Sequence, residues 1–257
     1  MARKKYIIGN WKMNMTVDQA VLYVNRIEKE IKPLKDVEVV ICPGTVCLYP
    51  LSKLVNTKKL KLGIQNFHYA DSGTFTGETS ATQVKEMVEY GIVGHSDRRR
   101  KFHEQDDDIA RKMTAALRNK ITPILCVGED LMQRQDGLTD VIIQDQLTTA
   151  LSMITAEEII QILIAYEPIW SISSGDGQGE NAKPEPVRKA IDTIRSTIRG
   201  LYGKKAEESL RVLYGGSSNP DNTVSYLQIK GVDGLLSGGA SLNYKSFAQM
   251  VDKAGKA

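Results

Sequence analysis

Eight short apolar runs recur along this chain, and they limit the folds that it can adopt. They span residues 6–8, 37–42, 60–64, 90–93, 122–127, 162–166, 211–214 and 232–236. Val, Ile and Leu dominate these runs with little polar alternation, which is typical of strands covered on both faces of a sheet. The chain between most of the runs is long enough to hold a helix.

Amphipathic stretches fill the intervals between the runs. Thr16 and Gln19 have the spacing of a capping box, and apolar residues follow at helical intervals as far as Ile31. Pro184 suits the first turn of another helix. Further apolar stripes comprise Ala110, Met113 and Leu117, then Ile143, Leu147, Leu151 and Ile154, and, after Pro184, Val187, Ile191, Ile194 and Ile198.

This alternation of strands and helices predicts an α/β fold with a parallel sheet. Eight strand–helix units without a linker favour a single (β/α)8 barrel domain over residues 1–257, with the helices outside the closed sheet. An open, doubly wound sheet that binds a dinucleotide is less consistent with the sequence, because no Gly-x-Gly-x-x-Gly motif follows the first run.

Composition excludes several classes of partner. The 34 Lys and Arg residues nearly balance the 31 Asp and Glu residues, so the net charge of +3 does not indicate a nucleic-acid surface. No apolar run approaches the roughly 20 residues that cross a membrane, and no signal-peptide core follows the basic N-terminus. Cys42, Cys47 and Cys126 lack metal-ligand spacing. We therefore expect a cytoplasmic protein with reduced thiols and with neither a nucleic-acid nor a membrane partner.

Three side chains that can do chemistry follow expected strands. Lys12 comes after the first run, His95 after the fourth and Glu167 after the sixth. In a closed parallel barrel, the carboxyl ends of the strands converge on one face, where active sites form. An ammonium, an imidazole and a carboxylate around a small pocket suit proton transfer next to a carbonyl group.

Each of these residues also has an ordinary structural explanation. A Glu at a strand end is commonly a salt-bridge partner, and a lone His is commonly structural. Apolar neighbours of Glu167 would partly desolvate its carboxylate and strengthen it as a base. The residues after His95 would open a loop or helix whose amides disfavour a charged imidazole. Lys12 could pair with Asp97 or remain free for an anionic substrate, and Asn10 shares its face and offers an amide donor.

Two glycine-rich strand ends indicate phosphate binding. Residues 215–220 (GGSSNP) follow the seventh run, and residues 237–242 (SGGASL) follow the eighth. Glycine lets backbone amides approach an anion closely, and a helix N-terminus adds a favourable dipole. Glycine turns are common, but two in succession after these strands match the phosphate site of such barrels.

The order of these motifs closely resembles that of the triosephosphate isomerase family over nearly the whole chain. The matching segments are residues 9–14 (GNWKMN), 65–66 (QN), 75–78 (FTGE), 94–96 (GHS), 126–129 (CVGE), 165–168 (AYEP), 213–217 (LYGGS) and 238–242 (GGASL). The resemblance implies a TIM barrel that interconverts dihydroxyacetone phosphate and D-glyceraldehyde 3-phosphate through an enediolate, in glycolysis and gluconeogenesis. It also implies that neither a metal nor an organic cofactor takes part.

The same resemblance implies roles for individual residues. Glu167 would take the proton from the carbon beside the carbonyl, and neutral His95 would polarise the carbonyl and pass protons between the two oxygens. Lys12 and Asn10 would stabilise negative charge, with Asp97 beside Lys12. The segment after Glu167 would form a lid. Backbone amides would hold the phosphate at Ser173, Ser217, Gly238 and Gly239.

A homodimer is implied as well. In the family, the loop over residues 65–82 inserts into a neighbouring subunit, where the Thr76 position reaches the region of the partner's Asn10 and the partner's Lys12. The loop contains Phe67, Tyr69 and Phe75 among polar and glycine residues. The alternative is a loop that folds on its own barrel.

Two departures from the family leave alternatives open. Asp97 stands where the family usually has Glu, so its contact with Lys12 should be longer, water-bridged or restored by a backbone shift. The lid reads SSG at 173–175 in place of Gly-Thr-Gly, and it continues through residue 183, longer than usual. An isomerase of a longer sugar phosphate, such as a tetrulose phosphate, is one alternative. A non-enzymatic phosphate-binding barrel is another, although it would not need a base beside a carbonyl.

Overall fold

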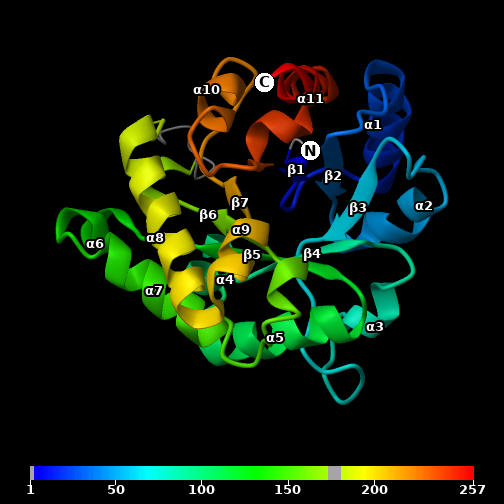
Figure 1. Ribbon diagram of the computed structural model, residues 1–257. Helices are drawn as coiled ribbons and strands as arrows, with labels where there is room; N and C mark the ends of the chain where they lie inside the picture. Colours follow the sequence, from blue (N-terminus) through cyan, green and yellow to red (C-terminus); the bar gives the residue numbers. More distant parts are fainter. Residues whose placement is uncertain (1–2, 173–180) are drawn as a thin grey trace.

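Eight parallel strands close into a barrel in the computed structural model, which describes residues 3–172 and 181–257 (Figure 1). The strands follow one another around the barrel in chain order, and β1 pairs with β8 to close it. They are β1 (Lys5–Asn10), β2 (Val37–Cys42), β3 (Lys61–Ile64), β4 (Tyr90–Val93), β5 (Thr122–Val127), β6 (Leu163–Tyr166), β7 (Arg211–Tyr214) and β8 (Gly234–Ser237). The predicted parallel α/β barrel is confirmed.

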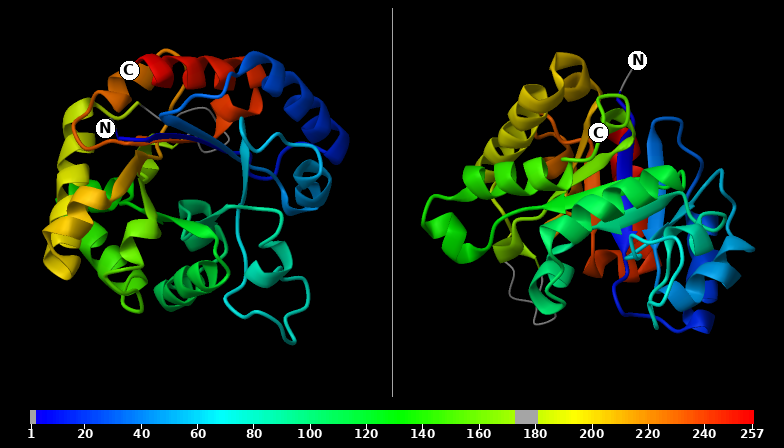
Figure 2. Two further views of the ribbon diagram at one scale, coloured as in Figure 1. Left: turned by 45° about the vertical axis from the view of Figure 1, so that its right-hand side comes forward. Right: turned by 90° about the horizontal axis from the view of Figure 1, so that it is seen from below.

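Helices form the outer layer around the strands (Figure 2). The α-helices are α1 (Val17–Glu30), α2 (Leu48–Ser52), α3 (Ala81–Val84), α4 (Ser96–Lys101), α5 (Asp106–Arg118), α6 (Leu131–Gln135), α7 (Thr139–Ala150), α8 (Pro184–Tyr202), α9 (Lys204–Ser209), α10 (Thr223–Leu227) and α11 (Tyr244–Lys256). Short 3-10 turns are η1 (Thr45–Cys47), η2 (Ile159–Gln161), η3 (Ile169–Ser171) and η4 (Gly239–Leu242).

Helix starts follow the sequence closely. Thr16 caps α1 through the predicted capping box, in which its side chain accepts from the Gln19 amide and Gln19 accepts in return. Pro184 is the first residue of α8. The end of α7 differs from the expected stripe, since Leu151 and Ile154 follow the helix. Both are buried there, and the Tyr202 hydroxyl donates to their carbonyl oxygens.

The expected bounds change at four strands, by one residue at the start of β3 and of β6 and by more at β1 and β8. The strand β1 reaches Asn10, so this amide side chain stands on the last residue of the strand rather than beyond it. The strand β8 starts at Gly234, because Gly231 has a φ of 94° and Val232 donates its amide to the Ile229 carbonyl in a tight turn. The turn uses the backbone groups that a longer strand would need.

The buried side chains fall into two layers because neighbouring residues of a strand point to opposite faces. Ile8 and Val40 belong to a cluster made of strand residues, which fills the barrel. Their neighbours Ile7 and Ile41 belong to the larger cluster that packs against the helices. Burial on both faces explains why the strands read as nearly continuous apolar runs.

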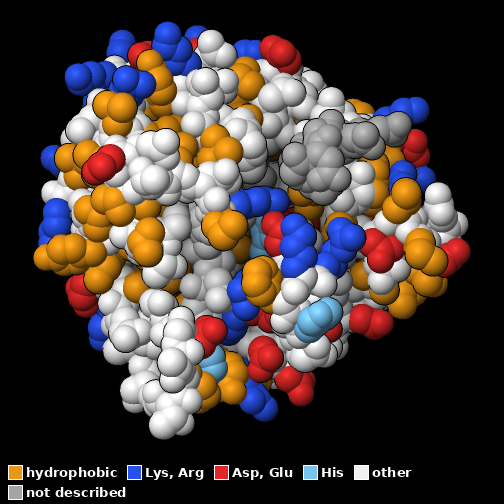
Figure 3. All heavy atoms as spheres, turned by 180° about the vertical axis from the view of Figure 1, so that it is seen from behind, with side chains coloured by type: hydrophobic (Ala, Val, Ile, Leu, Met, Phe, Trp, Pro, Cys, Tyr) orange, Lys and Arg blue, Asp and Glu red, His pale blue; other side chains and the backbone are white. Residues whose placement is uncertain are grey.

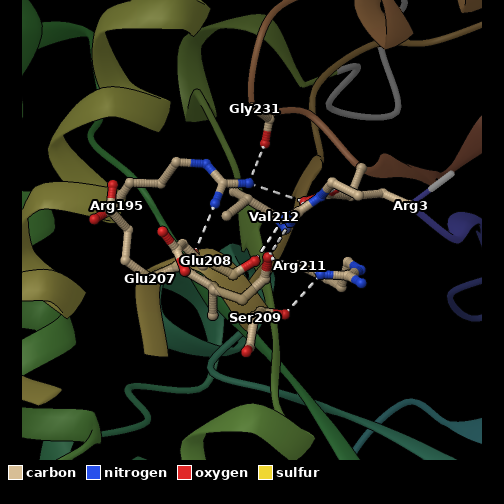
Figure 4. A network of polar contacts seen from close by, with 10 residues as sticks. Arg3, Arg195, Glu207, Glu208, Ser209, Arg211, Val212 and Gly231 are labelled. Carbon is tan, nitrogen blue, oxygen red and sulfur yellow. Dashed lines mark hydrogen bonds and ion pairs between the residues drawn. The ribbon is translucent and has the colours of Figure 1, made fainter. Parts of the chain in front are cut away.

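An ion-pair network holds the amino ends of the strands together (Figure 4). Asp233, which precedes β8, is 4% exposed and accepts from Arg3 at 2.6 Å and from Arg195 at 2.9 Å. The backbone amide of Val212 in β7 donates to the same carboxylate at 3.0 Å. The network therefore ties the N-terminal segment, α8, β7 and β8 to one buried charge.

The ends of the described chain lie side by side (Figure 2). The Lys5 ammonium at the start of β1 donates to the Ala254 carbonyl in α11 at 3.2 Å. The cysteines Cys42, Cys47 and Cys126 are free and buried, as expected for thiols in the core. Among the helices of the described residues, none is long and apolar enough to span a membrane.

Candidate active site

The carboxyl ends of the strands bring the predicted polar residues together. Glu167 directly follows β6, and His95 follows β4 after a turn at Gly94, whose φ of 70° suits glycine. One oxygen of the Glu167 carboxylate lies 3.1 Å from Nε2 of His95. Lys12 reaches Asp97, two residues after His95, at 3.0 Å. Positively and negatively charged side chains also gather near the centre of the face in Figure 3.

His95 is held in one orientation by its own helix. It caps α4, and its Nδ1 atom accepts a hydrogen bond from the Asp97 backbone amide at 3.0 Å. An Nδ1 atom that accepts carries no proton, so the ring is neutral and its proton sits on Nε2. That proton points at Glu167. The imidazole is 8% exposed and presents a single donor to the site.

Glu167 is buried as a doubly hydrogen-bonded carboxylate. The residue is 2% exposed, and its second oxygen accepts from the Ser96 amide at 2.9 Å. A buried charge is costly without such donors. Gly215 allows the carboxylate to lie here, because a Cβ at that position would stand 2.9 Å from Cγ of Glu167. Each of the two carboxylate oxygens therefore has a donor from within the protein.

Lys12 adopts an unusual backbone conformation that its neighbours stabilise. Its φ is 53°, in the left-handed region that few residues other than glycine adopt. Its amide donates to the Asn10 side-chain oxygen at 3.0 Å, and its carbonyl accepts from Gln65 at 2.8 Å. The Asn10 oxygen is therefore used inside the protein, which leaves its amino group as the part that can donate to a ligand.

Asp97 contacts Lys12 directly, although its side chain is one methylene shorter than Glu. Of the outcomes expected from the sequence, the longer and the water-bridged contacts are wrong, since the 3.0 Å separation is that of a direct ion pair. Partial burial alone would raise the pKa of Asp97. The Lys12 ammonium outweighs this effect, with a hydrogen bond from Lys101 adding to it, and holds the pKa at about 2.

The glycine-rich strand ends lie beside the charged groups. A Cβ on Gly238 would stand 3.8 Å from Cε of Lys12, and among the described residues none but the chain neighbours of Gly239 comes within 4 Å of a Cβ built there. Small ligand groups can therefore approach these backbones closely beside an ammonium. The Ser217 amide donates to the Ser171 carbonyl at 3.1 Å. Ser173 and the rest of residues 173–180, where most of the expected lid falls, lie outside the described residues.

Glu129 is a buried carboxylate whose role the sequence pattern does not reveal. It is fully buried and accepts from the Trp170 indole at 2.8 Å and from the Tyr166 hydroxyl at 3.1 Å. Burial raises the pKa of Glu129. The Arg134 guanidinium stacks 4.1 Å from the Trp170 ring. This group fixes the chain just after Glu167. Glu129 belongs to the CVGE segment at 126–129, but the spacing of that segment does not indicate that Trp170 and Tyr166 donate to its carboxylate.

The thiol of Cys126 lies under the same carboxylate. Burial, and then the Glu167 charge, raise the pKa of Cys126 well above its ordinary value, so the thiol remains neutral. Within the part of the chain that the structure describes, no group of three or more His, Cys, Asp or Glu side chains could hold a metal ion. The chemistry available from these residues is hydrogen bonding and proton transfer around Glu167, His95 and Lys12.

Comparisons with known proteins agree with this geometry. The family model described as triosephosphate isomerase matches residues 5–254. A triosephosphate isomerase of Clostridium beijerinckii is 41% identical over 254 residues, which cover 97% of this chain and 99% of the relative. One from Clostridium tetani is 38% identical over 97% of this chain and 96% of its own length. One from Caldanaerobacter subterraneus is 40% identical over 97% of this chain and 99% of its own.

Proposed function

Because the chain belongs to the triosephosphate isomerase family, we propose that Glu167, His95 and Lys12 carry out its proton transfers on a triose phosphate. The chain is an isomerase, which interconverts dihydroxyacetone phosphate and D-glyceraldehyde 3-phosphate. One observation carries the assignment of residues. The buried Glu167 carboxylate lies 3.1 Å from the single donor of a neutral His95, so a base and a carbonyl-polarising group share one pocket.

The reaction needs one proton to leave carbon and another to reach oxygen. Glu167 takes a proton from the carbon beside the carbonyl, and His95 donates its Nε2 proton toward the carbonyl oxygen. The product of this step is an enediolate. His95 then exchanges protons between the two oxygens, and Glu167 returns its proton to the neighbouring carbon. Atoms and charges balance without an oxidant or a second reactant.

Negative charge on the enediolate oxygens requires donors that are already in place. Lys12 supplies an ammonium and Asn10 supplies an amino group from the same strand end. In the free protein Lys12 pairs with Asp97, so substrate must replace this carboxylate as its partner. The Glu167 carboxylate likewise exchanges the Ser96 amide for the substrate carbon. Both movements are rotations of side chains inside a rigid barrel.

The phosphate would bind to backbone amides at Gly238, Gly239 and Ser217, with Ser173 as a further contact. The support is the open approach at Gly239 and the position of Gly238 beside Lys12. The Ser217 amide already donates to the Ser171 carbonyl, so it can reach a phosphate only by exchanging this hydrogen bond. We infer that ligand binding changes the conformation of the 215–218 segment.

A coupled assay with purified protein tests the proposed function. Dihydroxyacetone phosphate and D-glyceraldehyde 3-phosphate should be interconverted, with a higher kcat/KM than any tetrulose phosphate. Turnover of the tetrulose phosphate at a higher kcat/KM would support the isomerase of a longer sugar phosphate. Binding of both phosphates without turnover would indicate the non-enzymatic barrel.

We propose that the chain acts as a homodimer through the loop over residues 65–82. The connection from β3 to α3 extends away from the barrel (Figure 1), and its His68 ring stacks on Phe75 at 4.0 Å between centroids. Apolar side chains in the loops after β1 and β2 are open to contact, since Met13 is 98% exposed and Val46 is 76% exposed. A projecting loop and an uncovered apolar surface are complementary features of an interface.

Sedimentation of two variants tests the dimer. Thr76→Arg places a charge at the tip of the loop, and Thr57→Arg makes the same change on an exposed turn before β3. We expect wild type and Thr57→Arg to sediment as dimers, and Thr76→Arg to become monomeric and lose activity. A wild-type chain that is fully active as a monomer at micromolar concentration overturns the proposal.

Two broader proposals complete the assignment. We propose that residues 1–257 form one domain, because the pairing of β1 with β8 places the first and the last strand side by side in one closed sheet. We also propose a cytoplasmic location, for which the free, buried cysteines are the support. Limited proteolysis should release no stable half, and a tagged chain should fractionate with the cytoplasm.

A further inference from the structure

Asp97 is shared between two ammonium groups, one inside the site and one on the surface of α4. Its Oδ2 atom lies 3.0 Å from Nζ of Lys12, and its Oδ1 atom lies 3.1 Å from Nζ of Lys101. Lys12 comes from the loop after β1, whereas Lys101 is the last residue of α4. The carboxylate therefore bridges the site to the surface of the helix.

The backbone of α4 fixes the place of this carboxylate. Asp97 donates its amide to His95, so its main chain cannot move without turning the imidazole. Lys101 lies four residues further along the helix, which places its ammonium on the same helical face. A short aspartate on a fixed backbone has little reach. It cannot follow Lys12 when that side chain turns toward a substrate.

We propose that Lys101 is a positioning residue for the isomerase reaction, because it keeps Asp97 paired when Lys12 turns to the anionic substrate. The inference rests on the proposed function of Lys12. In the free protein Lys12 must leave a carboxylate before it can meet phosphate or enediolate oxygens. Without Lys101, Asp97 would hold Lys12 more strongly and would face the substrate as an unpaired negative charge. Both effects weaken substrate binding.

The exposure of the three charged side chains sets the expected size of the change in affinity. Lys101 is 66% exposed, whereas Lys12 and Asp97 are 30% and 32% exposed. Ion pairs at such exposure are worth up to about fivefold in an equilibrium constant. Lys101 should therefore change affinity about threefold. An ordinary pair on a helix surface would change stability slightly and would leave the affinity of the site unaltered.

Arg100 provides a matched control. It precedes Lys101 on α4, it is exposed, and it has no ion pair with the described residues. Arg100→Gln and Lys101→Gln each remove one positive charge from the same short helix. They differ in whether the removed charge contacts Asp97. Each substitution is made with Asp97 and with Asp97→Asn, which removes the charge that Lys101 is proposed to balance.

Binding of sn-glycerol 3-phosphate, measured by calorimetry, is the main readout, since this anion carries the phosphate but no carbonyl. With Asp97 present, Lys101→Gln should raise its Kd about threefold more than Arg100→Gln does. With Asp97→Asn, the two substitutions should have equal effects. Lys101→Arg should restore wild-type affinity. Steady-state kinetics should show the same pattern in KM, with kcat changed little.

Two outcomes overturn the inference. One is an equal rise in Kd for Lys101→Gln in the presence and absence of the Asp97 charge. The other is no rise beyond that of Arg100→Gln. The proposed function fails separately, if wild type binds the anion but does not turn over triose phosphate. In that case the Kd comparison still measures whether Lys101 acts through Asp97. A wild type that binds no anion overturns both.

Discussion

The two ends of the barrel use buried carboxylates in opposite ways. At the amino end, both oxygens of Asp233 accept from guanidinium groups, and a backbone amide completes the set (Figure 4). Both oxygens of Asp233 therefore have donors from within the protein. This arrangement stabilises the closed barrel, and it leaves neither oxygen of Asp233 without a donor.

At the carboxyl end, the buried carboxylate holds donors that a ligand would also use. Glu167 accepts from His95 and from the Ser96 amide, and Lys12 pairs with Asp97. The groups are satisfied in the free protein, and in the proposed function each of them exchanges its partner when substrate enters. The difference teaches that burial and ion pairing alone do not identify a catalytic carboxylate. The groups that donate hydrogen bonds to a catalytic carboxylate must also be groups that the substrate uses.

Asp233→Ala should give the largest effect, and it should be on stability. Removing this charge leaves Arg195, 14% exposed, without its carboxylate. Breaking a buried pair in this way costs about 3 kcal/mol. Urea unfolding should show this loss, while kcat of the remaining folded protein stays at the wild-type value. Asp192→Ala, which removes an exposed partner of Arg188, should cost less than about 0.5 kcal/mol. A stable Asp233→Ala protein with a low kcat would contradict the comparison.

Glu167→Asp should give the opposite result. The substitution withdraws the carboxylate by one methylene, and a misplacement near 1 Å can cost about 100-fold in rate. We expect kcat to fall by about that factor with a modest change in KM. The free energy of unfolding should change by less than about 1 kcal/mol. Glu185→Asp on the surface of α8 is the control. If kcat of Glu167→Asp remains near the wild-type value, Glu167 is not the group that abstracts the proton.

Gly215→Ala sharpens the comparison by moving the carboxylate without changing it. A methyl group here would stand 2.9 Å from Cγ of Glu167 and 3.1 Å from the Tyr166 carbonyl. One of these groups must shift, and we expect kcat to fall about tenfold, since small displacements of a base are costly. A methyl group on Gly200 in α8 meets none of the described atoms within 4 Å beyond its neighbours in the helix, so Gly200→Ala should stabilise the helix. Equal kcat values for the two variants would show that the position of Glu167 is not critical.

The pH dependence of the Lys12–Asp97 pair should be the smallest effect. The folded pKa of Asp97, about 2, lies below its ordinary value of 3.8. The pair therefore stabilises the folded protein fully above the ordinary pKa, and its contribution is lost as pH falls through the folded pKa. The difference in unfolding free energy between wild type and Asp97→Asn should be constant near neutral pH. It should shrink as pH falls from 3.8 toward 2. A difference that grows in acid would contradict the assignment.

Much of the architecture could be predicted from the sequence because burial on both faces leaves a strong pattern. The runs at 37–42 and 122–127 became β2 and β5 without a change of bounds. The convergence of Lys12, His95 and Glu167 followed from a rule of parallel barrels rather than from their own neighbours. The hydrogen-bond and ion-pair partners of each side chain were harder to predict, since they depend on distances between segments far apart in the chain. The Ser96 amide and Glu129 gave no signal because neither their residue type nor their spacing reveals what they bind.

Isomerisation in deuterium oxide, followed by NMR of the product, tests most directly whether the carboxyl end performs proton transfer. A base that takes the carbon-bound proton holds it where solvent can exchange it before it returns. We predict that D-glyceraldehyde 3-phosphate formed from dihydroxyacetone phosphate carries deuterium at the carbon beside the carbonyl. Incorporation and turnover should both fall in Glu167→Gln. A product that contains no deuterium at that carbon, at any extent of conversion, would indicate hydride transfer and contradict the account.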